Sequence, residues 1–261
     1  MIRFIKRFYV GLVFFFLYAP IIILMIFSFS DSKFRGHWGG FTLRWYVELF
    51  RDREIMSALY YTVLIAVLAS LIATIIGTIA ALGIHNMGKV GKNVIINLSY
   101  LPMLNPDIVT GISLMILFVF AKIERGFVTL LLAHITFNIP YVIFAVMPKL
   151  KQMNKHLYEA ALDLGATPSY AFRKVILPEI MPGVITGLIL AFTLSIDDFV
   201  ISYFTTGAGV SNLSIVIHSM ARLGINPSIN ALSTLMFVTV LLLLLIVNKR
   251  SSNNSRKENA I

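Results

Sequence analysis

The chain has 261 residues, of which 58% are apolar and 13% are charged, whereas soluble domains carry roughly 25% charged residues. The mean hydropathy of +0.85 argues against a water-soluble domain, and it excludes a disordered chain, because disorder requires low hydrophobicity and high charge. The formal net charge is +10, and the chain contains no cysteine, which excludes disulfides, thiolate zinc sites and iron–sulfur clusters.

Six apolar runs are long enough to cross a bilayer, since a helix needs roughly 20 mostly apolar residues to span about 30 Å of hydrocarbon. In chain order they cover residues 8–29, 58–84, 94–120, 127–147, 180–203 and 231–248. The predicted fold class is therefore all-α, a polytopic membrane protein with six transmembrane helices. Residues 1–261 are expected to form one domain, with an anchor helix over 8–29 and core helices within 58–248. The first run exceeds the usual 7 to 15 apolar residues of a signal peptide, so we expect an uncleaved anchor.

The charged residues between the spans predict the orientation. If the N-terminus is cytoplasmic, the inner segments hold 14 Lys and Arg residues and the outer segments hold 8. This bias follows the positive-inside rule and places both termini in the cytoplasm. It also explains the net charge without a nucleic-acid partner.

One segment nearly matches a phosphate-binding loop. Residues 83–90 contain glycine, four spacers and Gly-Lys, but Val90 stands where a hydroxyl residue should bind Mg²⁺. A helix end with a positive-inside lysine explains the segment better. If ATP drives this protein, another chain must hydrolyse it.

Two protease arrangements are possible but incomplete. Asp107 and Asp197 lie in different spans, as in an intramembrane aspartic protease whose carboxylates share a proton, but no Gly-x-Gly precedes Asp197. Ser113 and His134 could form a serine protease pair, although such pairs within spans more often form interhelical hydrogen bonds. An intramembrane protease remains the alternative of a different class.

Residues 148–179, called the coupling loop below, predict two short inner helices joined by a bend. Glu159–Leu164 consists of good helix formers, and Gly165 suits a left-handed position at a helix C-terminus. Residues 167–168, Thr-Pro, open a second helix, which Pro178 is expected to end. A plain connecting loop would explain the lysines but not this spacing.

Three carboxylates, Asp107, Asp197 and Asp198, lie within the predicted spans, and no Lys or Arg accompanies them. Each costs roughly 2.5 to 3.5 kcal/mol at a helix centre on insertion scales, so they require an explanation. We expect them to line the pathway of a cationic substrate. The alternative is that Asp197 and Asp198 only reach the outer headgroup region.

A polar face is expected on the fifth span. Thr186, Thr193 and Asp197 fall within about 40° of one another on a helix of 3.6 residues per turn. Three further residues are expected to extend this surface: Ser195, Asp198 and Ser202.

Proline and tryptophan residues add to the predicted pathway. Pro102 and Pro106 should kink or unwind the third span near Asp107, which is tolerated where the backbone faces a cavity or protein; a packing kink is the alternative.

Trp45 could stack on an alkylammonium by cation–π attraction. An anchor at the membrane interface is equally compatible with its position.

The coupling loop resembles the "EAA" loop of permease subunits of ATP-binding-cassette (ABC) importers: Glu-Ala-Ala, three residues, Gly, nine residues, a branched apolar residue, any residue, Leu-Pro. Val175 takes the usual Ile position. The resemblance implies the type I ABC importer permease fold and a loop that docks on a cytoplasmic ATPase. The matching residues are Glu159, Ala160, Ala161, Gly165, Leu177 and Pro178.

Other stretches are similar to the permease subunits of spermidine/putrescine importers of the PotC type, namely residues 106–109, 134–137, 194–198, 226–227 and 230–232. This resemblance implies a multi-pass protein of a bacterial inner membrane that moves polyamines into the cytoplasm by alternating access. The implied partners are a sister permease in a heterodimer, two ATPase subunits and a periplasmic polyamine-binding protein.

The resemblance implies neither a catalytic residue nor a cofactor nor a metal, so we expect no enzyme activity. The nearest alternative keeps the architecture and changes the cargo to thiamine, ferric ion or an oxyanion. The three acids oppose an anion strongly and thiamine less so.

Overall fold

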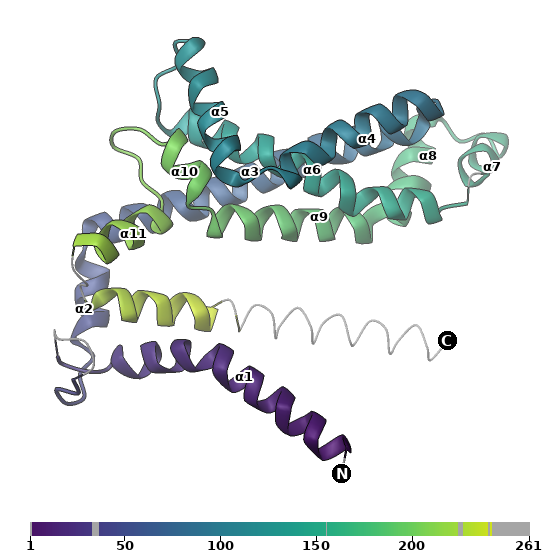
Figure 1. Ribbon diagram of the computed structural model, residues 1–261. Coiled ribbons are helices and arrows are strands. Elements are labelled where there is room, and N and C mark those ends of the chain that lie inside the picture. Colours follow the sequence, from purple (N-terminus) through teal and green to yellow (C-terminus); the bar gives the residue numbers. More distant parts are fainter. Residues whose placement is uncertain (1, 33–36, 155, 224–226, 240, 242–261) are drawn as a thin grey trace. The chain divides into compact units, whose positions relative to one another are not determined.

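The structure is a computed structural model that describes residues 2–32, 37–154, 156–223, 227–239 and 241. These residues form helices joined by short connections, and their only β-structure is one isolated bridge between Ser30 and Phe41 (Figure 1). The predicted all-α class is therefore confirmed. The chain divides into two compact units, residues 1–56 with 217–261 and residues 57–216.

The first unit contains the predicted anchor helix. α1 (Ile2–Phe27) is apolar enough to cross a membrane over Lys6–Phe27, close to the predicted span. α2 (Arg44–Arg51) follows it. An apolar helix over Ser228–Thr239 begins the predicted sixth span, most of whose later residues lie outside the described part of the chain.

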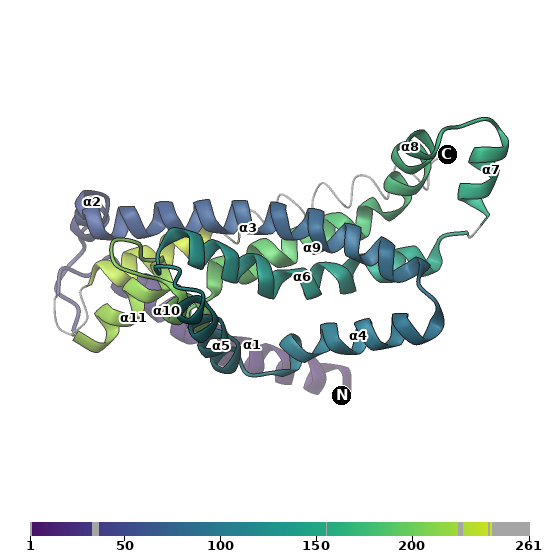
Figure 2. The ribbon, with the colours of Figure 1, turned by 90° about the horizontal axis from the view of Figure 1, so that it is seen from above.

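The centre of the second unit is formed by three long helices (Figure 2), namely α3 (Arg53–Asn86), α6 (Phe127–Gln152) and α9 (Leu177–Asp197). The first four residues of α3 belong to the first unit. The common core of the three helices holds nine buried residues, namely Ala81 and Ile84 of α3, Val142, Ile143, Val146, Met147 and Leu150 of α6, and Ile180 and Ala191 of α9. α4 (Lys89–Leu104) also packs on α6. The spans are therefore held together by apolar side chains from segments far apart in the sequence.

Small residues let α6 and α9 approach closely. Gly183, Gly187, Ala191 and Ser195 are buried at four-residue intervals on α9, so they form one stripe along the helix. A Cβ on Gly183 would lie 2.9 Å from the carbonyl oxygen of Ala145 in α6. Such stripes favour helix association in lipid, where close van der Waals packing replaces the hydrophobic effect.

Gly183→Ala should therefore lower the free energy of unfolding by about 1–3 kcal/mol, because the added methyl group would push the two backbones apart. Gly83→Ala in α3 is the matched control, since nothing described lies within 4 Å of its added Cβ. That substitution should be neutral or stabilising by up to about 1 kcal/mol. Thermal unfolding in detergent measures both variants, and equal midpoints would contradict the close contact.

The predicted third span is broken. α4 and α5 (Asp107–Phe120) meet at a bend of 104°. Pro106 lies at this bend, which confirms the predicted disruption, whereas Pro102 lies inside α4. Within the part of the chain that the structure describes, four helices, or five spans if this bent pair counts as one, are long and apolar enough to cross a membrane.

The predicted fifth span is also broken, which the sequence did not predict. α9 ends at Asp197, Asp198 has an extended backbone with ψ 124°, and α10 (Val200–Thr205) follows. α10 packs against α5, where a Cβ on Gly111 would lie 3.0 Å from the ring of Phe204. The two broken spans therefore meet each other.

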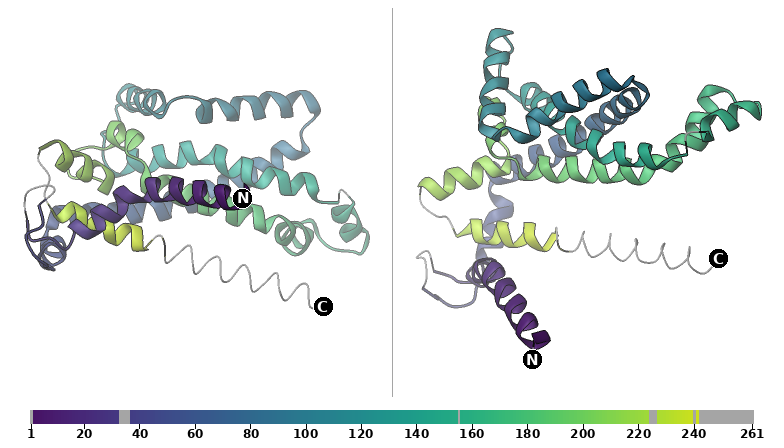
Figure 3. Two further views of the ribbon diagram at one scale, coloured as in Figure 1. Left: turned by 60° about the horizontal axis from the view of Figure 1, so that its bottom comes forward. Right: turned by 45° about the vertical axis from the view of Figure 1, so that its right-hand side comes forward.

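The inner helix of the coupling loop does not end at Pro178, so this prediction is wrong. α8 (Pro168–Ala171) continues through a π-helical segment, Phe172–Ile176, into α9. Pro178 lies in the first turn of α9, where a missing N–H is tolerated, and the π turn changes the local hydrogen-bond register. The coupling loop is therefore continuous with α9 and projects beyond the end of α6 (Figure 3).

Candidate functional site

The bend in the coupling loop has the predicted geometry. α7 (Leu157–Asp163) ends in a Schellman motif, in which the N–H of Gly165 donates to the carbonyl of Leu162 at 2.9 Å. The N–H of Ala166 donates to the carbonyl of Ala161 at 3.1 Å. This motif places a left-handed residue at its centre, and Gly165 has φ +85°. The glycine therefore fixes the angle between α7 and α8.

The surface of this bend is partly apolar. Leu164 is 90% exposed and Tyr170 is also exposed, while the side chain of Thr167 caps α8 by accepting the N–H of Tyr170 at 3.3 Å. Glu159 is exposed, with its carboxylate 3.1 Å from Nδ1 of His156. Leu164 and Tyr170 therefore leave apolar surface exposed on this bend.

An acidic residue stands at each break in the spans. Asp107 is the first residue of α5 and Asp197 is the last residue of α9, and both are exposed. The last-turn carbonyl groups of a helix have no helical N–H partner, so the end of α9 combines a carboxylate with partial negative charge. The end of α9 can therefore attract a cation through both charges, whereas Asp107 offers only its carboxylate, because the N-terminus of α5 carries partial positive charge.

The predicted polar face of α9 is exposed. Thr186, Thr193 and Asp197 are all exposed in the chain. The two hydroxyl groups donate to the carbonyls of Pro182 and Ile189, each at 2.8 Å, so their oxygen atoms remain able to accept. This face therefore offers hydrogen-bond acceptors beside the carboxylate.

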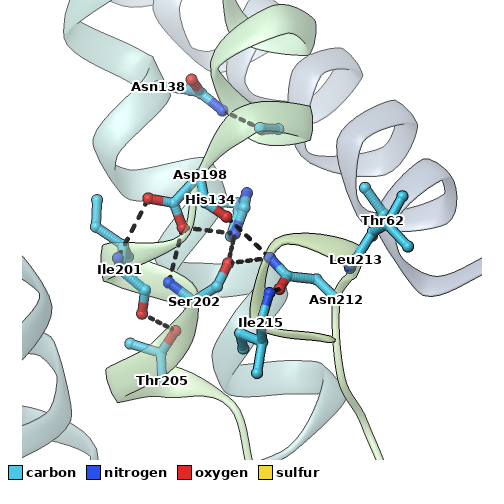
Figure 4. A network of polar contacts seen from close by, with 11 residues as sticks. Thr62, His134, Asn138, Asp198, Ile201, Ser202, Thr205, Asn212, Leu213 and Ile215 are labelled. Carbon is cyan, nitrogen blue, oxygen red and sulfur yellow. Dashed lines mark hydrogen bonds and ion pairs between the residues drawn. The ribbon is translucent and has the colours of Figure 1, made fainter. Parts of the chain in front are cut away.

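The side chain of Asp198 accepts hydrogen bonds from its own chain (Figure 4). Its side chain is 8% exposed, and its carboxylate oxygens accept the N–H groups of Ile201 at 3.2 Å and Ser202 at 2.7 Å. Nε2 of His134 in α6 lies 2.9 Å from Oγ of Ser202 and 3.6 Å from the carboxylate. Asp198 therefore caps α10 and lies against α6, which contradicts the expectation that it extends the exposed face.

Asn212 completes this group of contacts. Its Nδ2 donates to the backbone carbonyl of Asp198 at 2.9 Å and to Oγ of Ser202 at 2.7 Å, while its Oδ1 accepts the N–H of Ile215 at 3.0 Å and caps α11 (Leu213–Leu223). We call four residues the break cluster: His134, Asp198, Ser202 and Asn212. Among the described residues no three His, Asp or Glu side chains are grouped to hold a metal ion.

Ser195 does not extend the exposed face either, so that prediction is wrong. It is buried, and its Oγ accepts a hydrogen bond from Nδ2 of Asn138 in α6 at 2.8 Å. Residues two positions apart on a helix point about 200° apart, so Ser195 faces away from both Thr193 and Asp197. Ser202 is buried in the break cluster.

Trp45, which belongs to the first unit, is buried. It is 2% exposed, and its indole N–H donates to the carbonyl of Ser30 at 2.7 Å. The guanidinium of Arg44 lies 4.7 Å from the ring centroid, and its hydrogen bond to Glu48 raises the pKa of Arg44. The ring already contacts a cation of its own chain, which contradicts the expectation that it is free to stack on a substrate.

Asp198→Ala should lower the free energy of unfolding by about 1–3 kcal/mol, because two backbone N–H groups would lose their acceptor. Asp197→Ala is the control, since this side chain is exposed and such substitutions usually stay within about 0.5 kcal/mol. Thermal unfolding of the purified variants in detergent gives the comparison. An unchanged midpoint for Asp198→Ala would show that the cap is not formed.

The role of Asn212 was not predicted. A local signal existed, because Ser211-Asn212 precedes an apolar run, which is typical of a helix N-cap. Its contacts with Asp198 and Ser202 depend on how the helices pack, and no local pattern encodes them.

The sequence matches a known family and characterised relatives. Residues 73–252 match the family described as binding-protein-dependent transport system inner membrane component. The chain is 43% identical to the putrescine transport system permease protein PotI of Escherichia coli (strain K12) over 232 residues, 86% of this chain and 83% of the relative. It is 41% identical to the spermidine/putrescine transport system permease protein PotC of the same strain over 226 residues, 87% and 86% of the two chains. The PotC protein of Haemophilus influenzae is 38% identical over 238 residues, 91% and 93%.

Solved structures share the fold. A bacterial ABC transporter involved in the import of the acidic polysaccharide alginate matches with a TM-score of 0.72 at 17% identity, covering 97% of this chain and 98% of that one. The methionine ABC transporter MetNI in an inward-facing conformation matches with a TM-score of 0.56 at 18% identity, covering 76% and 96%. The predicted importer permease fold is thereby confirmed. Since the family match covers most of the chain, this protein belongs to the binding-protein-dependent transport system inner membrane components, the multi-pass permease subunits of ABC transporters.

Proposed function

We propose that this chain moves polyamines, spermidine or putrescine, into the cytoplasm by alternating access as one permease subunit of an importer. The observation that carries the proposal is its identity of 38% to 43% with permeases named for putrescine or spermidine/putrescine transport. Alternating access requires the affinity for polyamine to differ between the outward-facing and inward-facing states, because a ligand that binds both states equally shifts neither.

The chemistry at the two breaks supports a cationic cargo. Asp107 and Asp197 are exposed carboxylates, and they could replace water around the ammonium groups of a polyamine. In many secondary transporters, broken helices form the substrate site, and helix C-termini there coordinate the coupling cations. We propose Asp107, Asp197 and Thr193 as pathway residues, and we assign Asp198 and Ser195 to the packing behind them.

The coupling loop would connect the permease to its motor. Glu159 and Gly165 would dock on one of two ATPase subunits. The exposed Leu164, which lies between these two residues in the sequence, and α8 would dock with them. That subunit hydrolyses ATP, and this chain performs no covalent chemistry. Because Leu177 and Pro178 already belong to α9, a displaced loop would move α9 directly.

The remaining parts of the proposed assembly are a sister permease and a periplasmic polyamine-binding protein. In this arrangement the loop that meets the ATPase is cytoplasmic, and so are both termini. The excess of Lys and Arg in the inner segments supports this orientation.

Uptake into vesicles that contain all components tests the proposal. We expect ATP-dependent accumulation of radiolabelled putrescine or spermidine that unlabelled polyamines suppress. Suppression by thiamine or ferric ion, without transport of polyamine, would instead support another cargo. A chain that purifies without an ATPase and cleaves membrane peptides would support the intramembrane protease.

A further inference from the structure

The break cluster holds the chain where α9 ends. The backbone carbonyl of Asp198 accepts from Asn212, and its carboxylate accepts the N–H groups of Ile201 and Ser202. Asp197 immediately precedes this fixed residue, and its own side chain is exposed. Because the following residue is held by both its backbone and its side chain, the cluster fixes the backbone from which the side chain of Asp197 projects.

The same cluster, together with the neighbouring residue Leu213, joins four helices. His134 belongs to α6 and Ser202 to α10, and Asn212 caps α11. The next residue, Leu213, donates its N–H to Oγ1 of Thr62 in α3 at 2.8 Å. The position of Asp197 therefore depends on the arrangement of all four helices.

Two polar atoms of α6 argue that this layer serves more than stability. Among the described residues, Nδ1 of His134 and Oδ1 of Asn138 are buried without a hydrogen-bond partner within the chain, and they lie one helical turn apart. Each such group costs about 1–3 kcal/mol. Such departures from full polar pairing are expected at functional or strained sites.

We infer that Asn212 and His134 are positioning residues for transport, which act on the cargo through Asp197 by holding its carboxylate at the exposed end of α9. The inference rests on the proposed function, because it requires that Asp197 meets the transported cation. It adds two buried residues, neither of which contacts substrate, to the determinants of uptake.

A double-mutant cycle tests this inference in the complete reconstituted importer. Asn212→Ser keeps an oxygen that can cap α11, because Ser and Asn are similar N-caps. It removes Nδ2, which donates to the carbonyl of Asp198 and to Oγ of Ser202. We expect uptake per amount of membrane-inserted protein to fall about threefold to tenfold. In an Asp197→Asn background the same substitution should cause no further fall, because the carboxylate that it positions is already absent.

An equal fall in both backgrounds would overturn the inference, since a purely structural role does not depend on Asp197. His134→Phe provides a second double-mutant cycle, which is judged by the same criterion. His134→Gln can still hydrogen-bond to Ser202, so its uptake should be close to that of the unsubstituted importer. If the unsubstituted importer takes up another cargo, such as thiamine or ferric ion, in an ATP-dependent way but takes up no polyamine, the proposed cargo is wrong. That result differs from a failed cycle in an active polyamine importer.

Discussion

Gly165→Arg should abolish ATP-driven uptake and release the ATPase subunit from the purified importer. The Schellman motif holds residue 165 at φ +85°, which costs a residue with a Cβ about 1–2 kcal/mol, and the long cationic side chain would project from the docking surface. Nothing described lies within 4 Å of an added Cβ, so the rest of the fold should remain intact. Co-purification of the ATPase and vesicle uptake measure the two effects.

Two controls separate backbone strain from a blocked surface. Gly165→Asn should keep most of the uptake, because asparagine adopts the left-handed conformation more easily than other residues with a Cβ. Gly88→Arg adds the same side chain at another exposed glycine with open space around it, outside the coupling loop, and should keep the ATPase bound. A Gly165→Arg importer that retains both its ATPase and its uptake would refute the assigned role of the loop.

Asp197→Asn should lower polyamine uptake about tenfold to a hundredfold, and Asp197→Lys should abolish it. Hydrogen bonds to charged groups contribute about 1.5–3 kcal/mol, and each 1.4 kcal/mol corresponds to a factor of about ten. Asp107→Asn should have a similar effect, because it is the exposed acid at the other break. Initial rates of radiolabelled uptake, divided by the amount of protein in the membrane, give the comparison.

Glu124→Gln is the matched control for these substitutions. Glu124 is also an exposed acid of the second unit, but it lies in the turn between α5 and α6. Its neutralisation should leave uptake nearly unchanged. If all three neutralised variants transport normally, the cargo does not depend on the acids at the breaks.

The coupling loop could be predicted because its structure is encoded locally. A left-handed glycine ends α7, and a threonine cap followed by Pro168 begins α8. Each of these features depends on residues within four positions of one another. The end of the second helix could not be predicted, because Pro178 lies in a first turn that is created by the preceding π-helical segment.

The broken spans show what hydrophobicity alone leaves undetermined. A run of apolar residues indicates that a segment lies in the bilayer, but the break at Asp198 depends on partners from three other elements, including His134 and Asn212. The first break was partly predictable, since Pro106 cannot donate a helical hydrogen bond. No proline marks the second.

Helical periodicity correctly grouped Thr186, Thr193 and Asp197 on one exposed face. The prediction that Ser195 and Asp198 extend that face is wrong, because their polarity gives no information on which side of the helix they lie. A serine two positions from Asp197 points to the opposite side of the helix, where it meets Asn138. The angular position of each residue around the helix axis is therefore needed to distinguish buried polar residues between packed helices from residues that line a pathway.

The absence of cysteine allows a direct test of whether the exposed face of α9 lines a cation pathway. In the assembled importer, a membrane-impermeant cationic thiol reagent should label Thr193→Cys quickly and the buried Ser195→Cys slowly. Putrescine or spermidine should protect the first cysteine. Equally slow labelling of both cysteines, with no effect of polyamine, would mean that lipid or protein covers this face and would contradict the account.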